Sequence, residues 1–394
     1  MKKNCSSIIE SLKENNKIPM NFVEILQSDR PIVLYGCGNQ GSICEDILSC
    51  GMNFSIACFA VSDGKSKDTK WNSKIPVYHI SELVFDKESC GILITLGDGD
   101  TVYTDLKRRG YKHICKIDDW EEVNEALREV SLRNLCERNG VNLSVEEEII
   151  SYQKFKFINA LRENKMVKTM FIREFENITA KHIFHESKEY QVESSYECGQ
   201  VIMEEGDVVF DCGANIGIFS AVAASLGCSV YAFEPVQFIA NYTKKVAELY
   251  HGKMKVVDKV LSNQVGEISF VEVNSDYNYA GDSSKILVDG QYNESETHHL
   301  TKVPSITIDE YVRQNKIPRI DFIKADIEGA ERQMLSGAKK TLAELAPKLS
   351  ICTYHLPDDR EVLTNIIMAA NGQYKIEYKW DKLYAYVPDK YAKS

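Results

Sequence analysis

The sequence lacks several features that would each point to one class of protein. It has no run of about 18 apolar residues, so no membrane-spanning helix is expected. Its start, Met1–Cys5, continues into mixed polar sequence rather than an apolar core of about 7–15 residues, so we predict no signal peptide and a cytoplasmic location. An excess of positive charge is also missing. The 47 Lys and Arg against 58 Asp and Glu give a net charge of −11, which argues against binding to nucleic-acid backbones.

The 12 cysteines include no Cys-x-x-Cys pair, and the closest two are Cys44 and Cys50. Several others, such as Cys58, Cys212 and Cys352, lie in apolar runs that are typical of strands. We therefore expect reduced and mostly buried thiols, as in a cytoplasmic protein. This pattern argues against zinc ribbons, disulfide scaffolds and secreted enzymes.

Two strand–glycine–helix units stand far apart in the 394 residues. The first has a strand at 31–35, the loop Gly36-Cys37-Gly38-Asn39-Gln40-Gly41 and a helix at 42–49. The second has a strand at 207–211, the loop Cys212-Gly213-Ala214-Asn215-Ile216-Gly217 and a helix to 226. A short buried strand followed by glycines and an amphipathic helix opens a βαβ unit. The sequence therefore predicts an α/β protein with two doubly wound, Rossmann-like domains.

We expect the first domain at residues 1–120 and the second at 168–394. Residues 121–167 are highly charged, with apolar residues at helical spacing, and are expected to form a helical connector. Residues 168–200 look rich in β-structure. The strands expected after them lie at 208–211, 230–234, 254–257, 320–325, 349–354, 374–378 and 383–387. The last two are predicted to form an antiparallel hairpin.

The second glycine loop has features of a ligand site. Gly213 and Gly217 let the backbone approach a ligand closely, and the helix that follows offers unpaired N–H groups. Asp211 places a carboxylate there, which repels a pyrophosphate but suits a cationic ligand such as a sulfonium amino acid. Glu234 ends the next strand, 21 residues after Gly213, where an acid can bridge ribose hydroxyls. The alternative is that both acids only cap strand ends.

Residues 199–386 resemble the FkbM family of S-adenosylmethionine-dependent O-methyltransferases. The resemblance rests on six segments in order: Phe210–Gly217, Tyr231–Pro235, Leu261–Phe270, Thr307–Tyr311, Ile323–Glu331 and Tyr354–Asp359. It implies a class I methyltransferase fold of about seven strands with a terminal antiparallel hairpin. Ala325 departs from the Met or other apolar residue usual in the family. The cofactor-binding residues that it implies are Asp211, Gly213, Ala214, Asn215, Gly217, Glu234, Pro235, Ser262 and Asp326.

Three acids, Asp326, Glu328 and Glu331, follow the strand expected at 320–325. Ligands of open α/β sheets bind beyond the carboxyl ends of strands, so Asp326 is expected to face the methyl group of the cofactor. Acids this close together are costly unless they are solvated, protonated or bound to a cation. The cluster predicts a catalytic site that orients a hydroxyl, or a divalent metal site of unknown metal. The alternative is stabilisation of a helix N-terminus.

His355 follows the next strand and should lie at the same rim as Asp326. A neutral imidazole is a suitable acceptor for the proton of an attacking hydroxyl, and a carboxylate can orient it. A structural histidine is the alternative, and Asp359 either assists or simply starts a helix. Because a sulfonium is already a good leaving group, alignment should carry much of the rate. Residues expected to line the acceptor pocket, or to form plain surface, are Tyr277, Tyr279, Asp282, Ser283 and Ser284.

The first glycine loop has the full dinucleotide spacing, and Asp63 ends the next strand 27 residues after Gly36. The region resembles the N-terminal domain of bacterial sugar acyltransferases, which holds a UDP-sugar. The shared segments are Tyr35–Gly38, Phe59–Asp63, Ile75–Val77 and Leu106–Tyr111. The nucleotide-binding residues that this implies are Gly36, Gly38, Asn39, Gln40, Gly41 and Asp63. The alternative is a structural domain without a ligand.

From these features we predict an O-methyltransferase that acts on a sugar hydroxyl of a glycan or nucleotide-sugar precursor. The alternative is a nucleotide-sugar-binding module with a weak or inactive methyltransferase domain. An NAD-dependent sugar reductase would rest on the first glycine loop alone. Two histidine pairs, His182/His185 and His298/His299, are expected at the surface. The sequence leaves the oligomeric state open, with a homodimer as one option.

Overall fold

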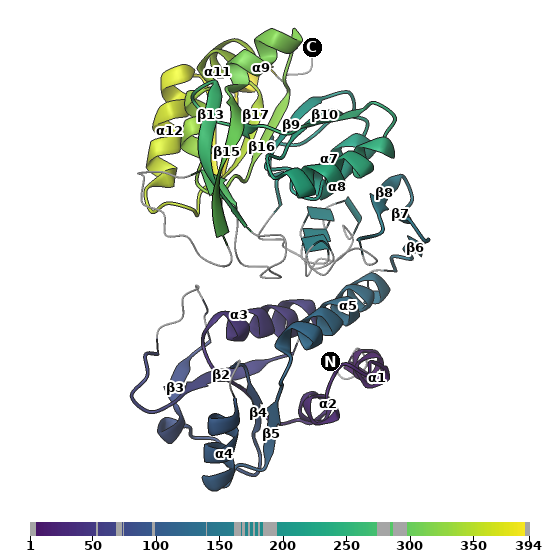
Figure 1. The fold of residues 1–394 in the computed structure, drawn as a ribbon, viewed down its shortest axis with the longest axis vertical. Coiled ribbons are helices and arrows are strands. Elements are labelled where there is room, and N and C mark those ends of the chain that lie inside the picture. The colour runs from purple at the N-terminus through teal and green to yellow at the C-terminus, as the bar shows by residue number, and fades with distance from the viewer. Residues whose placement is uncertain are drawn as a thin grey trace. The chain divides into compact units, whose positions relative to one another are not determined.

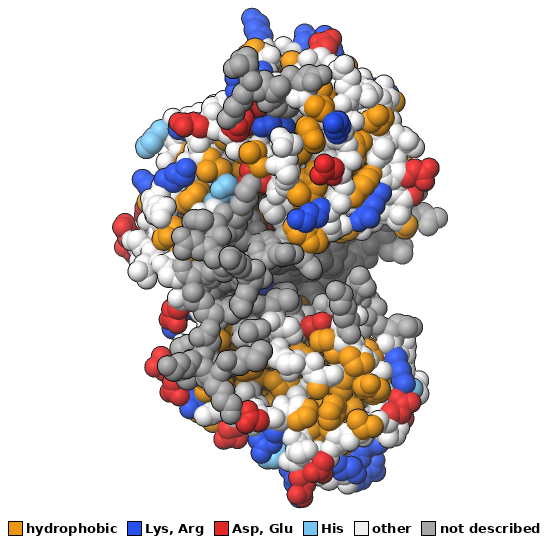
Figure 2. Space-filling model, turned by 180° about the vertical axis from the view of Figure 1, so that it is seen from behind, with side chains coloured by type: hydrophobic (Ala, Val, Ile, Leu, Met, Phe, Trp, Pro, Cys, Tyr) orange, Lys and Arg blue, Asp and Glu red, His pale blue; other side chains and the backbone are white. Residues whose placement is uncertain are grey.

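The computed structural model describes residues 5–390 apart from 53, 68–72, 74, 97–98, 139, 161–166, 168–169, 172–173, 176–177, 180–181, 184–194, 274–283 and 287–297. The chain divides into two compact units, Met1–Val141 and Asn142–Ser394 (Figure 1). In the described part of the face shown in Figure 2, positive and negative side chains are interspersed. No described helix is both long and apolar enough to cross a bilayer.

The first unit is built on a five-stranded parallel sheet with the order β3-β2-β1-β4-β5. Its strands are β1 (Ile32–Tyr35), β2 (Ile56–Val61), β3 (Val77–His79), β4 (Gly91–Ile94) and β5 (His113–Lys116). Its helices are α1 (Cys5–Glu14), α2 (Met20–Gln27), α3 (Asn39–Glu45), α4 (Asp100–Arg108) and α5 (Trp120–Arg138). Alternate residues of β1 enter two different apolar clusters, Leu34 in one and Val33 in the other. Helices therefore cover both faces of the sheet, as predicted for a doubly wound domain.

The segment expected to be a helical connector is only partly helical. Helix α5 covers its first part and buries Val123 and Leu127 in a cluster of the first unit. The prediction is wrong for the second part, which forms the antiparallel strands β6 (Ser144–Val145), β7 (Ile149–Tyr152) and β8 (Phe155–Ile158). The charged composition suggested a helix, but burial alternates from one residue to the next in β8. Phe155 and Phe157 are buried and Lys156 is exposed.

The expectation of β-structure at 168–200 is also wrong for the described residues up to 183. The described residues between 167 and 183 are helical. Phe171, Phe175 and Thr179 are buried and recur at the four-residue spacing of one helix face. The rings of Phe171 and Phe175 lie 5.1 Å apart. Aromatic residues favour strands in general, but here the period of burial decides the structure.

The second unit contains a seven-stranded sheet with the order β11-β10-β9-β16-β17-β19-β18. Its strands are β9 (Val208–Cys212), β10 (Ser229–Phe233), β11 (Met254–Val257), β16 (Phe322–Ala325), β17 (Lys348–Cys352), β18 (Lys375–Lys379) and β19 (Lys382–Tyr386). Its helices are α7 (Ile218–Ser225), α8 (Gln237–Glu248), α9 (Ile308–Asn315), α10 (Glu331–Ser336), α11 (Lys339–Glu344) and α12 (Asp359–Ala370). Strand β19 is antiparallel to both neighbours, and the other pairs are parallel. The predicted α/β class and terminal hairpin are confirmed.

A second sheet, with the order β12-β15-β13-β14, was not anticipated. Its strands are β12 (Val260–Leu261), β13 (Gly266–Val273), β14 (Lys285–Ile286) and β15 (His298–Ile306). Strand β12 follows β11 closely in the chain, so this sheet begins beside the carboxyl end of the main sheet.

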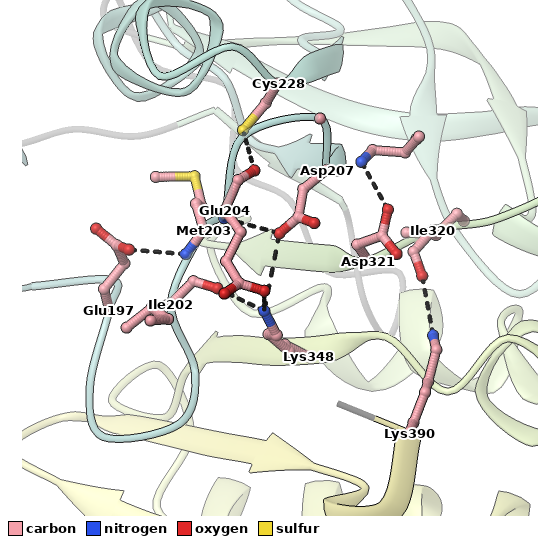
Figure 3. Close-up of polar contacts among 12 residues, drawn as sticks. Glu197, Ile202, Met203, Glu204, Asp207, Cys228, Ile320, Asp321, Lys348 and Lys390 are labelled. Atoms are coloured by element: carbon pink, nitrogen blue, oxygen red, sulfur yellow. Dashed lines mark hydrogen bonds and ion pairs between the residues drawn. The ribbon is translucent and has the colours of Figure 1, made fainter. Parts of the chain in front are cut away.

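Polar contacts bind together the amino ends of the central strands, as Figure 3 shows. Lys348 begins β17, and its side chain is only 2% exposed. Its Nζ donates to the carbonyl of Ile202 and lies 3.7 Å from Glu204 Oε2 and 3.8 Å from Asp207 Oδ2. Asp321 accepts the backbone N–H of Val208 at the start of β9. These charges stabilise this end of the sheet and leave the opposite, carboxyl end to the glycine loop.

Candidate active site

A cavity of about 460 Å³ lies in the second unit at the carboxyl ends of the central strands. The loops after β9, β10 and β16 contribute Gly213, Glu234 and Asp326 to its wall. Glu174 enters from the helical segment at 167–183, and Phe270 comes from the second sheet. The cavity is thus enclosed by segments far apart in the sequence, at the place where open α/β sheets bind ligands.

The glycine loop after β9 packs directly on the end of β16. Gly213 has φ +79°, and a Cβ there would lie 2.0 Å from the carbonyl oxygen of Asp326. Such a distance is impossible without moving backbone, so the close approach itself requires glycine. Gly217 also has a positive φ at the start of α7, and Ala214 lines the cavity.

Asp211 does not line the cavity, although the sequence suggested that it faces the ligand. Its carboxylate is fully buried, with Oδ1 3.0 Å from Lys324 Nζ and Oδ2 accepting the hydroxyl of Ser220. Lys324 does line the cavity and also donates to the carbonyl of Gly213. Burial opposes the charge of Lys324, but Asp211 and Asp326 hold its pKa above the ordinary value. Asp211 therefore fixes a buried cation beneath the loop.

Glu234 stands at the cavity wall as expected and is 6% exposed. Its Oε2 accepts the backbone N–H of Asn215 at 2.9 Å, and its Oε1 accepts that of Val236 at 3.0 Å. Burial raises the pKa of Glu234 to about 7, and these two hydrogen bonds act in the opposite direction. Each carboxylate oxygen retains acceptor capacity for a hydroxyl. Pro235 lies beside it in the wall, whereas Ser262 is buried outside the wall.

Asp326 faces the cavity between two tyrosines. Its Oδ2 accepts the hydroxyl of Tyr196 at 2.7 Å, and its Oδ1 accepts that of Tyr354 at 3.0 Å. Burial alone would raise the pKa of Asp326, but the charge of Lys324 and the Tyr196 hydrogen bond outweigh it and hold this pKa below the ordinary value. The group is therefore an oriented carboxylate with a quarter of its side chain exposed.

The other two acids of the cluster lie in different environments. Glu328 has a positive φ, lines the cavity and has a side chain that is 37% exposed. Glu331 begins α10, is completely buried and lies outside the cavity wall. Its Oε1 accepts the backbone N–H of Ile327, which orders the turn between β16 and α10.

The ring of His355 is surrounded by these carboxylates. Its Nε2 lies 3.3 Å from Glu328 Oε2 and 3.7 Å from Asp326 Oδ1, and its Nδ1 lies 3.3 Å from Glu331 Oε1. Burial lowers the pKa of His355, but Glu328 and Glu331 outweigh it and raise the pKa to about 10. The ring is therefore charged at neutral pH in the absence of another cation. This differs from the neutral imidazole that we expected, and His355 does not line the cavity.

The sequence did not reveal four residues that complete this wall: Tyr196, Lys324, Tyr354 and Lys382. Lys324 Nζ lies 5.1 Å from the centre of the Tyr196 ring, and Lys382 Nζ lies 4.9 Å from it. A lysine within the apolar strand β16 was a usable signal, because a buried charge needs a partner. Nothing local marked Tyr196, which meets Asp326 across 130 residues of chain.

Other candidate residues take structural or peripheral places. Ser284 lines the cavity, whereas Asp359 is buried, starts α12 and binds Arg332. His182 is partly buried and pairs with Glu197, contrary to the surface position expected. His299 is exposed in β15, as expected, and His298 lies in the same strand with a side chain outside the described part. The candidates outside the described residues are His185, Tyr277, Tyr279, Asp282 and Ser283.

The glycine loop of the first unit is shaped mainly by packing. A Cβ on Gly41 would lie 2.2 Å from the carbonyl oxygen of Gly36, whereas a Cβ on Gly38 would meet nothing within 4 Å. The Asp63 carboxylate already accepts hydrogen bonds from Ser81 and Arg109. Of the remaining candidates, Gln40 accepts the side-chain amide of Asn124, and Asn39 begins α3 with a side chain outside the described part.

Comparisons with known proteins agree with the C-terminal part of this picture. Residues 211–378 match the family model of the methyltransferase FkbM domain, as the motifs predicted. Hexuronic acid methyltransferase AglP of Haloferax volcanii is 27% identical over 167 residues, which are 42% of this chain and 64% of AglP. The chain thus spans just under two thirds of this curated relative.

Two solved structures are also similar to the chain. A methyltransferase FkbM from Methylobacillus flagellatus KT is 18% identical, with a TM-score of 0.40, over 98% of this chain and 99% of that one. An rRNA methylase from Streptococcus thermophilus is 13% identical, with a TM-score of 0.28, over 47% of this chain and 87% of that one. The resemblance of the first unit to sugar acyltransferases stays a prediction.

Proposed function

We propose that this chain is an S-adenosylmethionine-dependent O-methyltransferase that acts on a sugar hydroxyl of a glycan or nucleotide-sugar precursor. The proposal rests on one observation above all. Within the FkbM domain, a cavity holds an oriented acid, Glu234, beside the glycine loop and a second oriented acid, Asp326, at its other side.

The charge of the cavity wall supports a positively charged ligand. Five acidic side chains line it against three lysines. Apolar side chains such as Phe233, Val236 and Leu261 supply a surface for a purine ring. When bound, S-adenosylmethionine would supply an activated methyl group on a sulfonium. Glu234 is placed to accept the two ribose hydroxyls, and its hydrogen bonds to backbone N–H groups fix its direction.

For the acceptor, Asp326 is the group that we assign to orient the attacking hydroxyl. The hydroxyls of Tyr196 and Tyr354 hold its carboxylate in place, so little reorientation is needed on binding. The proton of the hydroxyl would pass to the carboxylates at the cavity, Asp326 or the more exposed Glu328. A charged His355 cannot accept it and instead balances their negative charge.

A sugar acceptor is supported by the name of the relative AglP, which acts on hexuronic acid. The half-exposed ring of Tyr354 in the cavity wall offers a stacking surface for a sugar. The test is the release of S-adenosylhomocysteine across a panel of hexoses, hexuronic acids and nucleotide-sugars. Turnover of none of them, although the cofactor binds, would remove the sugar from the proposal.

The cofactor half has its own test by calorimetry with S-adenosylmethionine. We expect Glu234→Ala to weaken binding by about 10- to 100-fold, because two charge-assisted hydrogen bonds are lost. Glu248→Gln, an exposed carboxylate at the end of α8, serves as the matched control and should bind like wild type. No binding to wild type, or unchanged binding to Glu234→Ala, would contradict the proposal.

The first unit is proposed as a second site, for a nucleotide-linked sugar. The open surface at Gly38 favours it, at the carboxyl ends of parallel strands. Thermal shifts with UDP-, GDP- and dTDP-sugars test it. A shift that Gly38→Val abolishes would support the site, and no shift with any of them would refute it.

A further inference from the structure

We propose that Asp326, Glu331 and His355 bind a divalent transition-metal ion beside the cavity. One ligand atom of each residue lies within 4.8 Å of those of the other two. Ligands about 2.1 Å from a common ion can stand up to about 4.2 Å apart, so small side-chain rotations suffice. The three residues come from the ends of two adjacent strands and the first turn of α10, which fixes their backbones.

A second observation indicates that something is bound there. The side chain of His355 is 8% exposed, and its ring nitrogens lie 3.3 Å from carboxylate oxygens without a hydrogen bond of good geometry. Oε2 of the fully buried Glu331 also has no hydrogen-bond partner. Buried polar atoms are almost always satisfied, and these three belong to the same cluster. A metal ion would bind the nitrogen and the carboxylate together.

The surroundings match those of known metal sites. A histidine ligand usually donates its other ring N–H to a carboxylate, and here Glu328 and Glu331 each lie 3.3 Å from one of the two ring nitrogens. Asp326 is itself held by the hydroxyls of Tyr196 and Tyr354. One imidazole with two carboxylates favours Mn²⁺ or Zn²⁺ over Mg²⁺, which prefers oxygen alone. Asp326 and Glu328 line the cavity and open a path for the ion.

The role of such an ion rests on the proposed function, but its binding does not. Beside Asp326, it would lie near the expected position of the acceptor hydroxyl. There it would lower the pKa of that hydroxyl and favour loss of its proton to a carboxylate.

Metal binding is measured directly on the full chain after treatment with EDTA and removal of the chelator. Calorimetry with MnCl₂, ZnCl₂ and MgCl₂, and electron paramagnetic resonance of Mn²⁺, report the stoichiometry and affinity. We expect one ion per chain for Mn²⁺ or Zn²⁺. Affinity should fall at least about tenfold in Glu331→Gln and in His355→Gln, because each removes one ligand. Tight binding of Mg²⁺ alone would contradict the nitrogen ligand.

The controls separate the site from nonspecific binding and from misfolding. His299→Gln and Glu248→Gln change exposed residues elsewhere and should bind the ion like wild type. Circular dichroism and thermal unfolding show whether each variant is folded. If a ligand variant does not fold, Asp326→Asn is measured in its place, because Asp326 is the more exposed ligand. No binding of these ions at about 1 mM, or equal affinity in all folded ligand variants, overturns the inference. Metal binding without binding of S-adenosylmethionine would refute the proposed function and leave the metal site standing.

Discussion

The buried carboxylate of Glu234 predicts how cofactor affinity depends on pH. Burial raises its pKa to about 7, so the group changes charge near neutrality. The ionised form can accept both backbone N–H bonds and both ribose hydroxyls, whereas a proton on either oxygen occupies one of these positions. Affinity for S-adenosylmethionine should therefore rise with pH. If only the ionised form binds, the apparent Kd scales as one plus the ratio of protonated to ionised Glu234. It should fall about tenfold between about pH 6 and about pH 8.

The assay is calorimetry with S-adenosylmethionine across that pH interval, on wild type and on Glu234→Gln. The glutamine does not titrate, so any pH dependence that it retains belongs to the ligand. The Kd of Glu234→Gln divided by the Kd of wild type should increase about tenfold from the acidic to the basic end of the interval. Glu248→Gln should follow wild type throughout. A ratio that stays constant would refute the assignment of Glu234 to the ribose and the reasoning from its burial.

The same shift has a consequence for stability, with a defined sign. The pKa of Glu234 rises from 4.5 to about 7 on folding, so the folded state holds an extra proton between these values. The unfolding free energy of wild type relative to Glu234→Gln should fall as pH rises through this window. The change should be about 3 kcal/mol, measured by denaturant unfolding without ligand. A difference that is independent of pH would show that the folded environment does not shift this group.

Three further predictions follow from contacts at the same end of the sheet. Gly213→Ala should destabilise the protein by at least about 2 kcal/mol more than Gly252→Ala, because both have positive φ but only the first brings Cβ against backbone. Equal losses of stability for Gly213→Ala and Gly252→Ala in thermal unfolding would contradict the clash at Gly213. Lys324→Met should cost about 3–5 kcal/mol in denaturant unfolding, because it leaves Asp211 charged and unpaired, and adding Asp211→Asn should recover part of this. If the double variant regains none of the lost unfolding free energy, the ion pair between Lys324 and Asp211 is contradicted. Asp326→Asn should bind S-adenosylmethionine within a few-fold of wild type and lose about 100-fold or more in kcat. Unchanged release of S-adenosylhomocysteine would remove Asp326 from the mechanism.

Some elements could be predicted because their signal is local. Strand β11 has the expected bounds, since a short apolar run between turns has few alternatives. Gly213 and Glu234 line the cavity because strand ends and glycines fix the backbone around them. The three strands after α5 and the helical residues at 167–183 were misjudged. The charged composition of the first segment suggested a helix, and the aromatic residues of the second suggested strands. The spacing of buried residues, which only the folded chain shows, corresponds to strands in the first and to a helix in the second.

By itself, the sequence determined the α/β architecture, the match of residues 211–378 to the FkbM domain and the chemical types of residue at the end of the sheet. These three features depend on the spacing of hydrophobic residues and on short motifs, and both are properties of neighbouring residues in the sequence. Only the tertiary structure decided what those residues do. It paired Asp211 with Lys324, placed Tyr196 on Asp326 and surrounded His355 with carboxylates. Charge state and orientation depend on burial and on partners brought together across the sheet, and a linear pattern does not specify either.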